Sequence, residues 1–309
     1  MITIPETDLV VHPLCLGSNI FGSNADEAQS HLVMDAYAHH GGNFIDTADM
    51  YNQWVPGHVG GESESVIGSW LNSRGNRSQM VIATKVSKMD RRPGLSAANI
   101  LAACEESLNR LQSDYIDLYY SHEDDATVSL EETLGAYAQL IAEGKVRYIA
   151  ASNFTPARLR ESITFSEDNN LPAYVAVQDL YNLVDRKGYE GEMAQTVAEL
   201  GISNIPFYGI ARGFLTGKYR PGVTDVDSKR AAGAMEYAND QNYAVLAAMD
   251  VIAKDHNASL AAIALAWLRA QPTVSAPIAS ARTVDQLNEI IQIVELNAGE
   301  VEKLNAISA

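Results

Sequence analysis

Two side chains that can hold or move a proton lie in one short segment, NFIDTADMY, which spans residues 43–51. Phe44 and Ile45 form an apolar run typical of a buried strand, and Asp46 stands where turn residues take over. Tyr51 follows five residues later. Ligands bind where parallel strands end, because the loops there can vary while the strands hold them in place. We therefore expect a binding site around this carboxylate and this phenol.

Two other strand ends carry titratable side chains. The run VIATK ends with Lys85 and IDLYYSH ends with His122, so neighbouring strands would present Asp46, Lys85 and His122 to one place. Such a residue alone is most often a turn former or a solvated charge. Together with Tyr51 they predict more, because an ammonium beside a phenol stabilises the phenolate and lowers its pKa from about 10.

A phenol tuned in this way can give or take a proton near neutral pH. The carboxylate of Asp46 would keep Lys85 charged and in place, while a neutral imidazole at His122 would donate a hydrogen bond to a carbonyl oxygen. Together these four side chains could protonate a carbonyl as it is reduced, or deprotonate an alcohol as it is oxidised. None of these side chains supplies a hydride, so the chemistry requires a nicotinamide cofactor.

The net charge and the cysteines of the chain limit the kinds of ligand and partner that it can bind. The formal net charge of -17 argues against nucleic acid and anionic membranes, since phosphate groups attract basic surfaces. A ligand that carries phosphate must then meet a local cluster of cations. The two cysteines, Cys15 and Cys104, have no metal-ligand spacing around them, so we expect buried free thiols and no metal site.

The chain contains 309 residues, of which 47% are hydrophobic and 20% are charged, as is typical of a globular protein. No run reaches the roughly 20 apolar residues of a transmembrane helix. The first residues, MITIPETDLVV, lack the basic and then apolar pattern of a signal peptide. We therefore expect a cytoplasmic protein.

Eight short apolar runs alternate with longer segments of helical spacing, which is the pattern of parallel βα units. The expected strands are 14–16, 43–46, 80–84, 116–120, 148–151, 174–178, 203–206 and 274–277. The expected helices are 25–39, 96–111, 130–143, one that opens at Thr155 and Pro156, 190–200, 260–270, 283–294 and 300–307. Eight such strands predict an α/β fold, a (β/α)8 TIM barrel that forms a single domain over residues 1–309.

Two long loops interrupt this alternation on the side where the strands end. Residues 52–60 form the first loop and contain Trp54, and residues 213–257 form a connection after the seventh strand with its own helical piece. Long ordered loops in a compact domain are usually functional. We expect Trp54, Asn19 and Ile20 to face the substrate, because all three lie in loops that follow strand ends near Asp46 and Tyr51.

The motifs of the chain resemble those of the aldo-keto reductases, which are (β/α)8 barrels that use NADPH or NADH. The resemblance covers essentially the whole chain, in the family's order, through the segments NFIDTADMY, VIATK, ESLNRLQSDYIDLYYSH, GKVRYIAASNF, VQDLYNLVDR, ARGFLTGKY and PIASARTVDQL. It implies that Tyr51 is the general acid/base and that Lys85 and Asp46 tune it. His122 would orient the carbonyl of a small-molecule aldehyde or ketone, or the corresponding alcohol.

The same resemblance implies contacts to the nicotinamide half of the cofactor. Ser152, Asn153 and Gln178 would bind the carboxamide group. Phe207 would stack on the ring. Three positions depart from the family's usual pattern: residues 206–210 read PFYGI where PYSPL is common, Ser280 replaces a glycine, and an asparagine near the adenine is replaced by Ile290.

The implied contacts to the other half of the cofactor involve phosphate. Arg212, Gly213 and Lys218 would hold the pyrophosphate, because glycine allows a close backbone approach and the cations supply charge. Arg282 would pair with the adenosine 2'-phosphate, which favours NADPH and leaves NADH possible. The remaining contacts are implied for Gly17, Ser18, Gly209, Ser280 and Gln286.

Two other functions fit part of this pattern. Relatives of this family that serve as channel subunits can keep the same four residues, so a nicotinamide-sensing binding protein with little turnover is an alternative. A barrel without a cofactor could use Lys85 for Schiff-base chemistry, or Asp46 and His122 for hydrolysis. A Schiff-base lysine needs its pKa lowered by burial, and a neighbouring aspartate acts in the opposite direction. The sequence does not indicate an oligomeric state.

Overall fold

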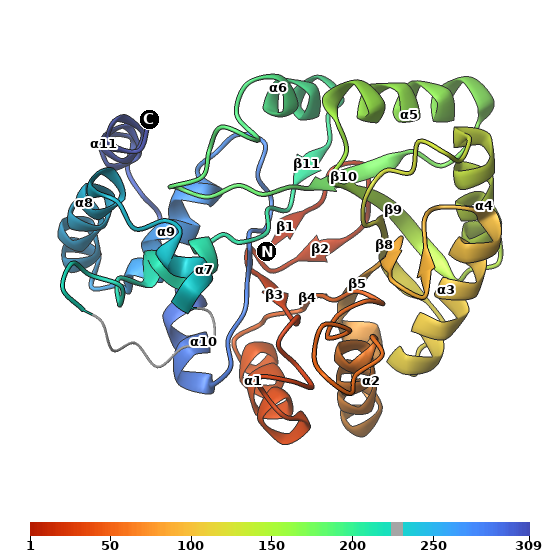
Figure 1. Cartoon of the computed structure of the whole chain (residues 1–309), viewed down its shortest axis with the longest axis horizontal. Helices are drawn as coiled ribbons and strands as arrows, with labels where there is room; N and C mark the ends of the chain where they lie inside the picture. The colour runs from red at the N-terminus through yellow and green to blue at the C-terminus, as the bar shows by residue number, and fades with distance from the viewer. Residues whose placement is uncertain (224–230) are drawn as a thin grey trace.

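The structure, a computed structural model, describes residues 1–223 and 231–309 (Figure 1). Eight strands form one parallel sheet that curls on itself, and helices cover its outside. In order along the sheet they are β11 (Ser203–Asn204), β10 (Tyr174–Gln178), β9 (Val146–Ser152), β8 (Ile116–Ser121), β5 (Val81–Val86), β4 (Phe44–Asp46), β3 (Cys15–Gly17) and β12 (Ile278–Ala279).

The two edge strands of this sheet, β11 and β12, are joined through the residues that flank them. The Asn204 N–H donates to the carbonyl of Thr273 at 2.7 Å, and the Ser275 N–H donates to the carbonyl of Asn204 at 3.0 Å. The Ile278 N–H donates to the Pro206 carbonyl at 2.9 Å. Because these bonds close the sheet, the structure confirms the expected (β/α)8 barrel.

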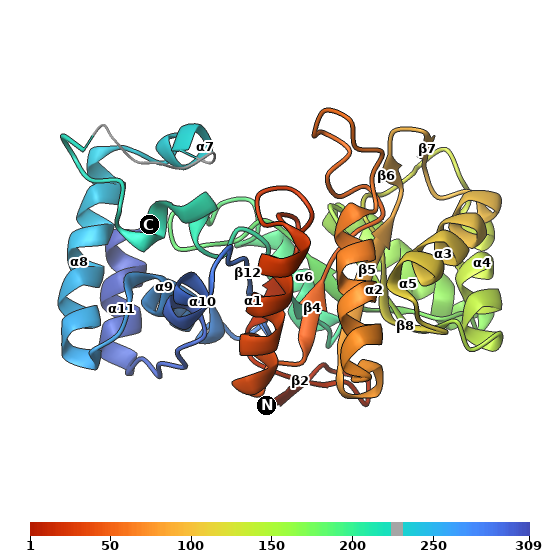
Figure 2. The ribbon, with the colours of Figure 1, turned by 90° about the horizontal axis from the view of Figure 1, so that it is seen from below.

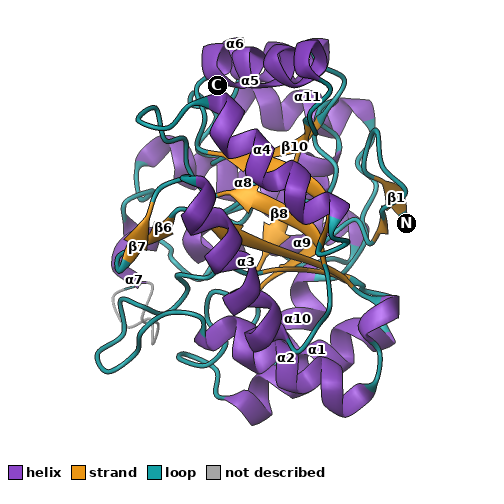
Figure 3. Ribbon diagram, turned by 90° about the vertical axis from the view of Figure 1, so that its right-hand side faces the viewer, coloured by secondary structure: helices purple, strands orange, loops and turns teal. Residues whose placement is uncertain are grey.

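The helices lie outside the barrel, as Figures 1 and 3 show. They are α1 (Glu27–His39), α2 (Glu62–Arg74), α3 (Ala97–Leu111), α4 (Leu130–Ala142), α5 (Pro156–Asn169), α6 (Glu192–Glu199), α7 (Ala231–Met235), α8 (Asp240–His256), α9 (Leu260–Arg269), α10 (Val284–Ile290) and α11 (Ala298–Ile307). Two of these helices, α8 and α11, lie farther out beyond α9. Shorter elements are the 3-10 helices η1 (Arg77–Gln79) and η2 (Ala211–Thr216), and the strands β1 (Ile2–Thr3), β2 (Val10–Val11), β6 (Lys88–Met89) and β7 (Arg92–Pro93).

Two helices with a capping side chain begin where the sequence predicts. Ser96 caps α3 by accepting a hydrogen bond from the Asn99 N–H. Thr155 caps α5 by accepting from the Arg158 N–H, and Pro156 occupies the first turn. These starts are readable because a side-chain oxygen satisfies an N–H group that the helix itself leaves without a partner.

Several elements differ from the expectation. The helix expected at 283–294 ends at Ile290, and two other differences have a local cause. Helix α2 was not predicted: it begins after Gly60 and Gly61, with φ of 92° and 89°, and it has no capping side chain to announce its start. The eighth strand was placed at 274–277, but β12 begins only after Pro277, which has no N–H to give to the sheet. The expected helical piece within 213–257 is present as α7 and α8, while its residues 224–230 lie outside the described residues.

The two ends of the barrel carry different hairpins, as Figure 2 shows. The strands β6 and β7 pair antiparallel at one end. The strands β1 and β2 pair antiparallel at the opposite end, near the N-terminus. Ile4, Leu9 and Val11 from this second hairpin pack with residues of the barrel interior such as Phe44 and Leu118. The N-terminal hairpin therefore closes the base of the barrel, and the mouth lies at the other end.

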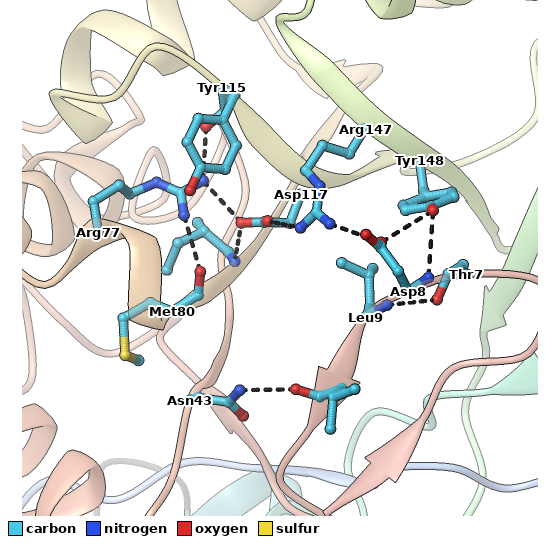
Figure 4. A network of polar contacts seen from close by, with 12 residues as sticks. Thr7, Asp8, Leu9, Asn43, Arg77, Met80, Tyr115, Asp117, Arg147 and Tyr148 are labelled. Atoms are coloured by element: carbon cyan, nitrogen blue, oxygen red, sulfur yellow. Dashed lines mark hydrogen bonds and ion pairs between the residues drawn. The ribbon is translucent and has the colours of Figure 1, made fainter.

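A chain of paired charges crosses this base (Figure 4). Asp117, at the start of β8, is 1% exposed, and its carboxylate accepts from Arg77 at 2.8 Å and from Arg147 at 2.6 Å. The Ile82 N–H donates to the same carboxylate at 2.9 Å. Arg147 also pairs with Asp8 at 2.7 Å, which ties the N-terminal hairpin to the barrel.

Three further features of the described part of the chain concern membrane spans, metal ligands and cysteines. There, no helix is long and apolar enough to cross a membrane, and no group of three or more His, Cys, Asp or Glu could hold a metal ion. Cys15 and Cys104 are buried free thiols, as expected.

Candidate active site

The three predicted strand-end residues meet at the mouth of the barrel. Asp46 is the last residue of β4, Lys85 lies near the end of β5, and His122 directly follows β8. The register places Lys85 beside Tyr120 of β8, and Asp46 beside Ala83 of β5. Neighbouring parallel strands therefore bring these side chains to the same end of the sheet.

Lys85 is the centre of this group. Its Nζ donates to Asp46 Oδ2 at 2.6 Å, to the Thr47 carbonyl at 2.7 Å and to Tyr51 Oη at 2.9 Å. Tyr51 Oη lies 3.3 Å from the same Asp46 oxygen. Lys85 is fully buried and Asp46 is 2% exposed, so the pair is shielded from water. Burial lowers the pKa of Lys85, and the charge of Asp46 opposes that shift.

The pKa of Tyr51 differs from the expectation. Burial raises the pKa of Tyr51 well above its usual value, and the negative charge of Asp46 adds to the rise. The expected lowering by Lys85 is therefore wrong for this structure, because the low-dielectric surroundings and the carboxylate both disfavour a phenolate. At neutral pH the side chain is a protonated phenol, which is a proton donor.

His122 lies beside Tyr51, with its ring centroid 6.2 Å from that of the tyrosine. Burial lowers the pKa of His122 well below its usual value, and the charges of Lys85 and Lys88 lower it further. Its Nδ1 is buried and finds no hydrogen-bond partner among residues 1–223 and 231–309. The imidazole is therefore neutral, as expected, and carries one N–H to donate.

A cavity of about 310 Å³ opens over this group. It is lined by Gly17, Ser18, Asn19, Asp46, Met50, Tyr51, Trp54, Lys88, His122, Ser152, Asn153, Gln178, Phe207, Tyr208, Ile210, Arg212, Ile278, Ala279 and Ser280. The structure thus brings most of the predicted site residues together. Six of these residues were not predicted, and only their closeness in sequence to predicted residues could have suggested them: Met50, Lys88, Tyr208, Ile210, Ile278 and Ala279.

Hydrogen bonds fix the polar residues on one wall of this cavity. Gln178 Nε2 donates to Asp46 Oδ1 at 2.8 Å, and the Gln178 backbone carbonyl accepts from Ser152 Oγ at 2.7 Å. Asn153 Nδ2 donates to Ser152 Oγ at 3.0 Å and to the His122 carbonyl at 2.9 Å. These side chains are held in defined orientations, which a site that recognises an amide requires.

A second cavity adjoins the first and shares Ile210, Arg212 and Ser280 with it. It is lined by Ile20, Asn24, Ile210, Arg212, Gly213, Thr216, Lys218, Ser280, Arg282, Gln286, Glu289 and Ile290. Three of these residues, Arg212, Lys218 and Arg282, are cations. An overall acidic chain thus gathers positive charge in one place, next to the cavity that holds Tyr51.

The backbone between the two cavities is sharply turned. Ala211, Arg212 and Gly213 have φ of 48°, 54° and 99° in succession, and Tyr208 has φ of 55°. A non-glycine residue in this region costs about 1 kcal/mol or more, and such strain is concentrated at ligand sites. At Gly17, on the other wall, an added Cβ would lie 2.7 Å from the Ile278 side chain, so only glycine fits there.

Three predicted residues need separate comment. The expectation for Ile20 is wrong: it borders the second cavity instead of the one around Tyr51, and its side chain is 3% exposed and belongs to the hydrophobic core. Gly209 lines neither of these two cavities in the described part of the chain: a Cβ added to it would lie 3.1 Å from the side chains of Leu265 and Leu268 of α9. Trp54 does reach the mouth, where it is 55% exposed and its ring centroid lies 6.2 Å from that of Tyr51.

Fold and site together define a class of protein: a TIM barrel with a buried Lys–Asp pair against a tyrosine and a cation-lined cavity beside it. The chain belongs to the aldo/keto reductase family, whose sequence model matches residues 13–309. Members of this family are oxidoreductases that act on small-molecule carbonyl compounds and use nicotinamide cofactors.

Similar proteins of known name extend over nearly the whole chain. Protein tas of Escherichia coli (strain K12) is 33% identical, over 96% of this chain and 93% of that protein. Norsolorinic acid reductase B of Aspergillus parasiticus is 30% identical, over 98% of this chain and 81% of that protein. A probable voltage-gated potassium channel subunit beta of Arabidopsis thaliana is 29% identical, over 94% of this chain and 90% of that protein.

Proposed function

We propose that the protein is an NAD(P)H-dependent oxidoreductase that interconverts an aldehyde or ketone and its alcohol, with Tyr51 as general acid/base. The observation that carries this proposal is the position of Lys85 Nζ, 2.6 Å from Asp46 and 2.9 Å from Tyr51 Oη, under a cavity. A cation this close to a phenol stabilises the phenolate that forms when the proton leaves.

In the reducing direction, the nicotinamide cofactor supplies a hydride to the carbonyl carbon when it is bound. The carbonyl π electrons move to oxygen, which takes the proton of Tyr51 Oη and becomes the alcohol. The raised pKa of Tyr51 keeps that proton in place until the carbonyl oxygen gains charge. Lys85 then stabilises the phenolate, Asp46 holds Lys85, and solvent returns the proton.

His122 orients the substrate in this proposal. Because its imidazole is neutral, it donates a hydrogen bond to the carbonyl oxygen without competing with Tyr51 for the proton. Its ring is T-shaped to the Tyr51 ring at 6.2 Å, so both can border one bound oxygen. The carbonyl would thus be held between a hydrogen-bond donor and a proton donor.

The two adjoining cavities fit the two halves of a dinucleotide. Ser152, Asn153 and Gln178 would bind the nicotinamide carboxamide beside Tyr51, with Phe207 stacked on the ring. Phosphate groups would lie in the second cavity, against the cations and the glycine that line it. Those residues are Arg212, Gly213, Lys218, Arg282 and Gln286, with Gly17, Ser18 and Ser280 between the two halves.

We further propose NADPH as the preferred cofactor. Arg282 lines the second cavity and is free of any ion pair with the residues that the structure describes, and its guanidinium suits a phosphate. NADH lacks the 2'-phosphate and would lose that contact. The second cavity is lined by three cations and one carboxylate, Glu289, so its lining is net positive although the chain has a net charge of -17.

The names of the relatives support two candidate functions. Norsolorinic acid reductase B is named as a reductase, which favours an enzyme. The potassium channel subunit beta of Arabidopsis is named for an assembly, which favours a binding protein that senses the cofactor. Turnover separates the two, because a sensor needs only to bind the nucleotide.

The experiment is a panel of aldehydes, ketones and alcohols, offered to the purified protein with each of the four nicotinamide nucleotides. We expect loss of absorbance at the nicotinamide band with NADPH and a reactive aromatic aldehyde, and a lower rate with NADH. Nucleotide binding without turnover across the panel would favour the sensor. Failure to bind any nicotinamide nucleotide would overturn both.

A further inference from the structure

We propose that the carbonyl substrate carries an anionic group, a carboxylate or a phosphate, and that Lys88 binds it at the mouth of the barrel. This inference rests on the proposed function and adds a substrate class to it. It starts from one observation: Lys88 lines the cavity that holds Tyr51 and His122, yet the proposed chemistry does not use it.

The backbone around Lys88 is held in place. Lys88 belongs to β6 and is paired with Pro93 of β7 in the hairpin at the mouth. Its carbonyl accepts from Gln53 Nε2 at 3.3 Å, and the Asp90 N–H donates to Gln53 Oε1 at 3.1 Å. The hairpin is thereby linked to loop 52–60, which brings Trp54 to the same cavity. The backbone that carries the Lys88 side chain is thus held at the edge of the cavity that contains Tyr51 and His122.

Lys88 has an exchangeable partner. Its Nζ lies 3.1 Å from Glu123 Oε2, and the two side chains are 35% and 45% exposed. A pair this open to water contributes about 0 to 1 kcal/mol, so a ligand anion can displace the glutamate. The effect of Lys88 on the pKa of His122 agrees with the geometry, since it means that the ammonium acts on the ring beside the substrate carbonyl.

The other cations nearby are committed elsewhere. Lys85 is fully buried and bound to Asp46. Arg212 forms an equally open pair with Glu236, but it borders both cavities and is proposed to hold the cofactor phosphates. Lys218 and Arg282 border the second cavity, where the cofactor phosphates are proposed. Within the described ranges, Lys88 is therefore the cation that belongs to the first cavity alone and remains available to a substrate.

An acidic protein needs such a cation if its substrate is an anion. The net charge of -17 repels anions at long range, and a local positive charge at the mouth offsets this repulsion where the substrate binds. The ammonium of lysine is a compact charge that accepts either a carboxylate or a phosphate. The geometry therefore assigns the charge of the substrate and leaves its carbon skeleton open.

The test compares matched pairs of aldehydes that differ in charge. One pair is para-carboxybenzaldehyde and its neutral methyl ester; the other is glyceraldehyde phosphate and glyceraldehyde. The quantity measured is kcat/KM for the anion divided by kcat/KM for its neutral partner, at low salt. Lys88→Met should lower this ratio roughly tenfold in at least one pair, because a charge-assisted hydrogen bond is lost, and Lys88→Arg should restore much of it.

The control is a substitution of Glu123, the ion-pair partner of Lys88. Glu123→Gln removes the competing carboxylate, so it should raise the same ratio, whereas a merely structural pair would respond alike to loss of either partner. Thermal unfolding of each variant shows whether the fold is kept. A ratio unchanged by both substitutions, or lowered by both, would overturn the role of Lys88. If neither neutral nor charged aldehydes are turned over, the proposed function itself fails and this inference fails with it.

Discussion

Two buried carboxylates lie at opposite ends of the same barrel. Asp46 at the mouth accepts from Lys85, Tyr51 and Gln178, and Asp117 at the base accepts from Arg77, Arg147 and a backbone N–H (Figure 4). Both are nearly inaccessible to water, with 2% and 1% of their surface exposed. By burial and by number of partners the two sites are alike.

The difference lies in what the partners can do. A guanidinium holds its protons at any pH a protein meets, so Asp117 can only bind and orient. A lysine and a phenol can release a proton, so the charge on Asp46 changes the chemistry of its neighbours. The mouth also keeps buried groups that the described residues leave without partners, among them His122 Nδ1 and both Asp49 oxygens. Paired charge at the base suits stability, and incompletely paired charge at the mouth suits function.

The largest expected effect concerns the mouth. Tyr51→Phe removes the proposed proton donor and keeps the ring, so kcat for an aldehyde should fall roughly a thousandfold, within the usual range for loss of a general acid. Binding of the nucleotide should stay near that of the wild type, because the cation-lined cavity is unchanged. Steady-state kinetics and a fluorescence titration with NADPH measure the two. Undiminished turnover would remove Tyr51 as the acid.

The next effect concerns the base. Asp117→Asn leaves the guanidinium groups of Arg77 and Arg147 without their shared carboxylate, which should lower the free energy of unfolding by roughly 3 to 5 kcal/mol. Urea unfolding measures this change. A loss below about 1 kcal/mol would contradict this prediction, because it would mean that the contacts of Asp117 contribute no more than ordinary surface ion pairs do.

A third effect is a pH dependence of the free energy of unfolding, which arises from Asp49 at the mouth. Burial, together with the charge of Glu64, raises the pKa of Asp49 to about 7. The unfolded chain ionises this group near pH 4 and the folded chain only near pH 7, so stability should fall as pH rises between these values, by up to about 1.4 kcal/mol per unit. Asp49→Asn should remove that fall. Parallel curves of unfolding free energy against pH for wild type and variant would contradict the assignment.

The smallest effect is at the rim of the base. Asp8 pairs with Arg147, but the two side chains are 70% and 34% exposed. Asp8→Ala should therefore change the free energy of unfolding by about 0.5 kcal/mol or less, and less still in high salt. A change as large as that of Asp117→Asn would show that exposure does not separate the two contacts.

Much of this arrangement could be predicted from the sequence. The strand ends at Asp46, Lys85 and His122 were readable because the apolar run of a buried strand stops sharply at a polar residue. The helix caps at Ser96 and Thr155 were readable because the capping oxygens are local. In both cases the signal lies within a few residues of the feature.

The parts that could not be predicted depend on contacts far apart in the chain. The pKa of Tyr51 rises because of how deeply its surroundings are buried, which no local pattern records. Lys88 reaches the cavity only because the hairpin β6–β7 folds over the mouth. Ile20 reaches the second cavity because of packing around it, and α2 begins at two glycines without a capping side chain.

The most direct test of the difference between the two ends is one pair of kcat values. Asp46→Asn and Asp117→Asn are the same chemical change at opposite ends of the barrel, and kcat is measured per folded molecule with NADPH and an aromatic aldehyde. We predict that kcat falls roughly a hundredfold for Asp46→Asn, because Lys85 and Tyr51 lose their tuning charge, and changes less than about twofold for Asp117→Asn, because a paired charge remote from the chemistry acts on stability. Equal losses of kcat in the two variants, or wild-type kcat in Asp46→Asn, would contradict it.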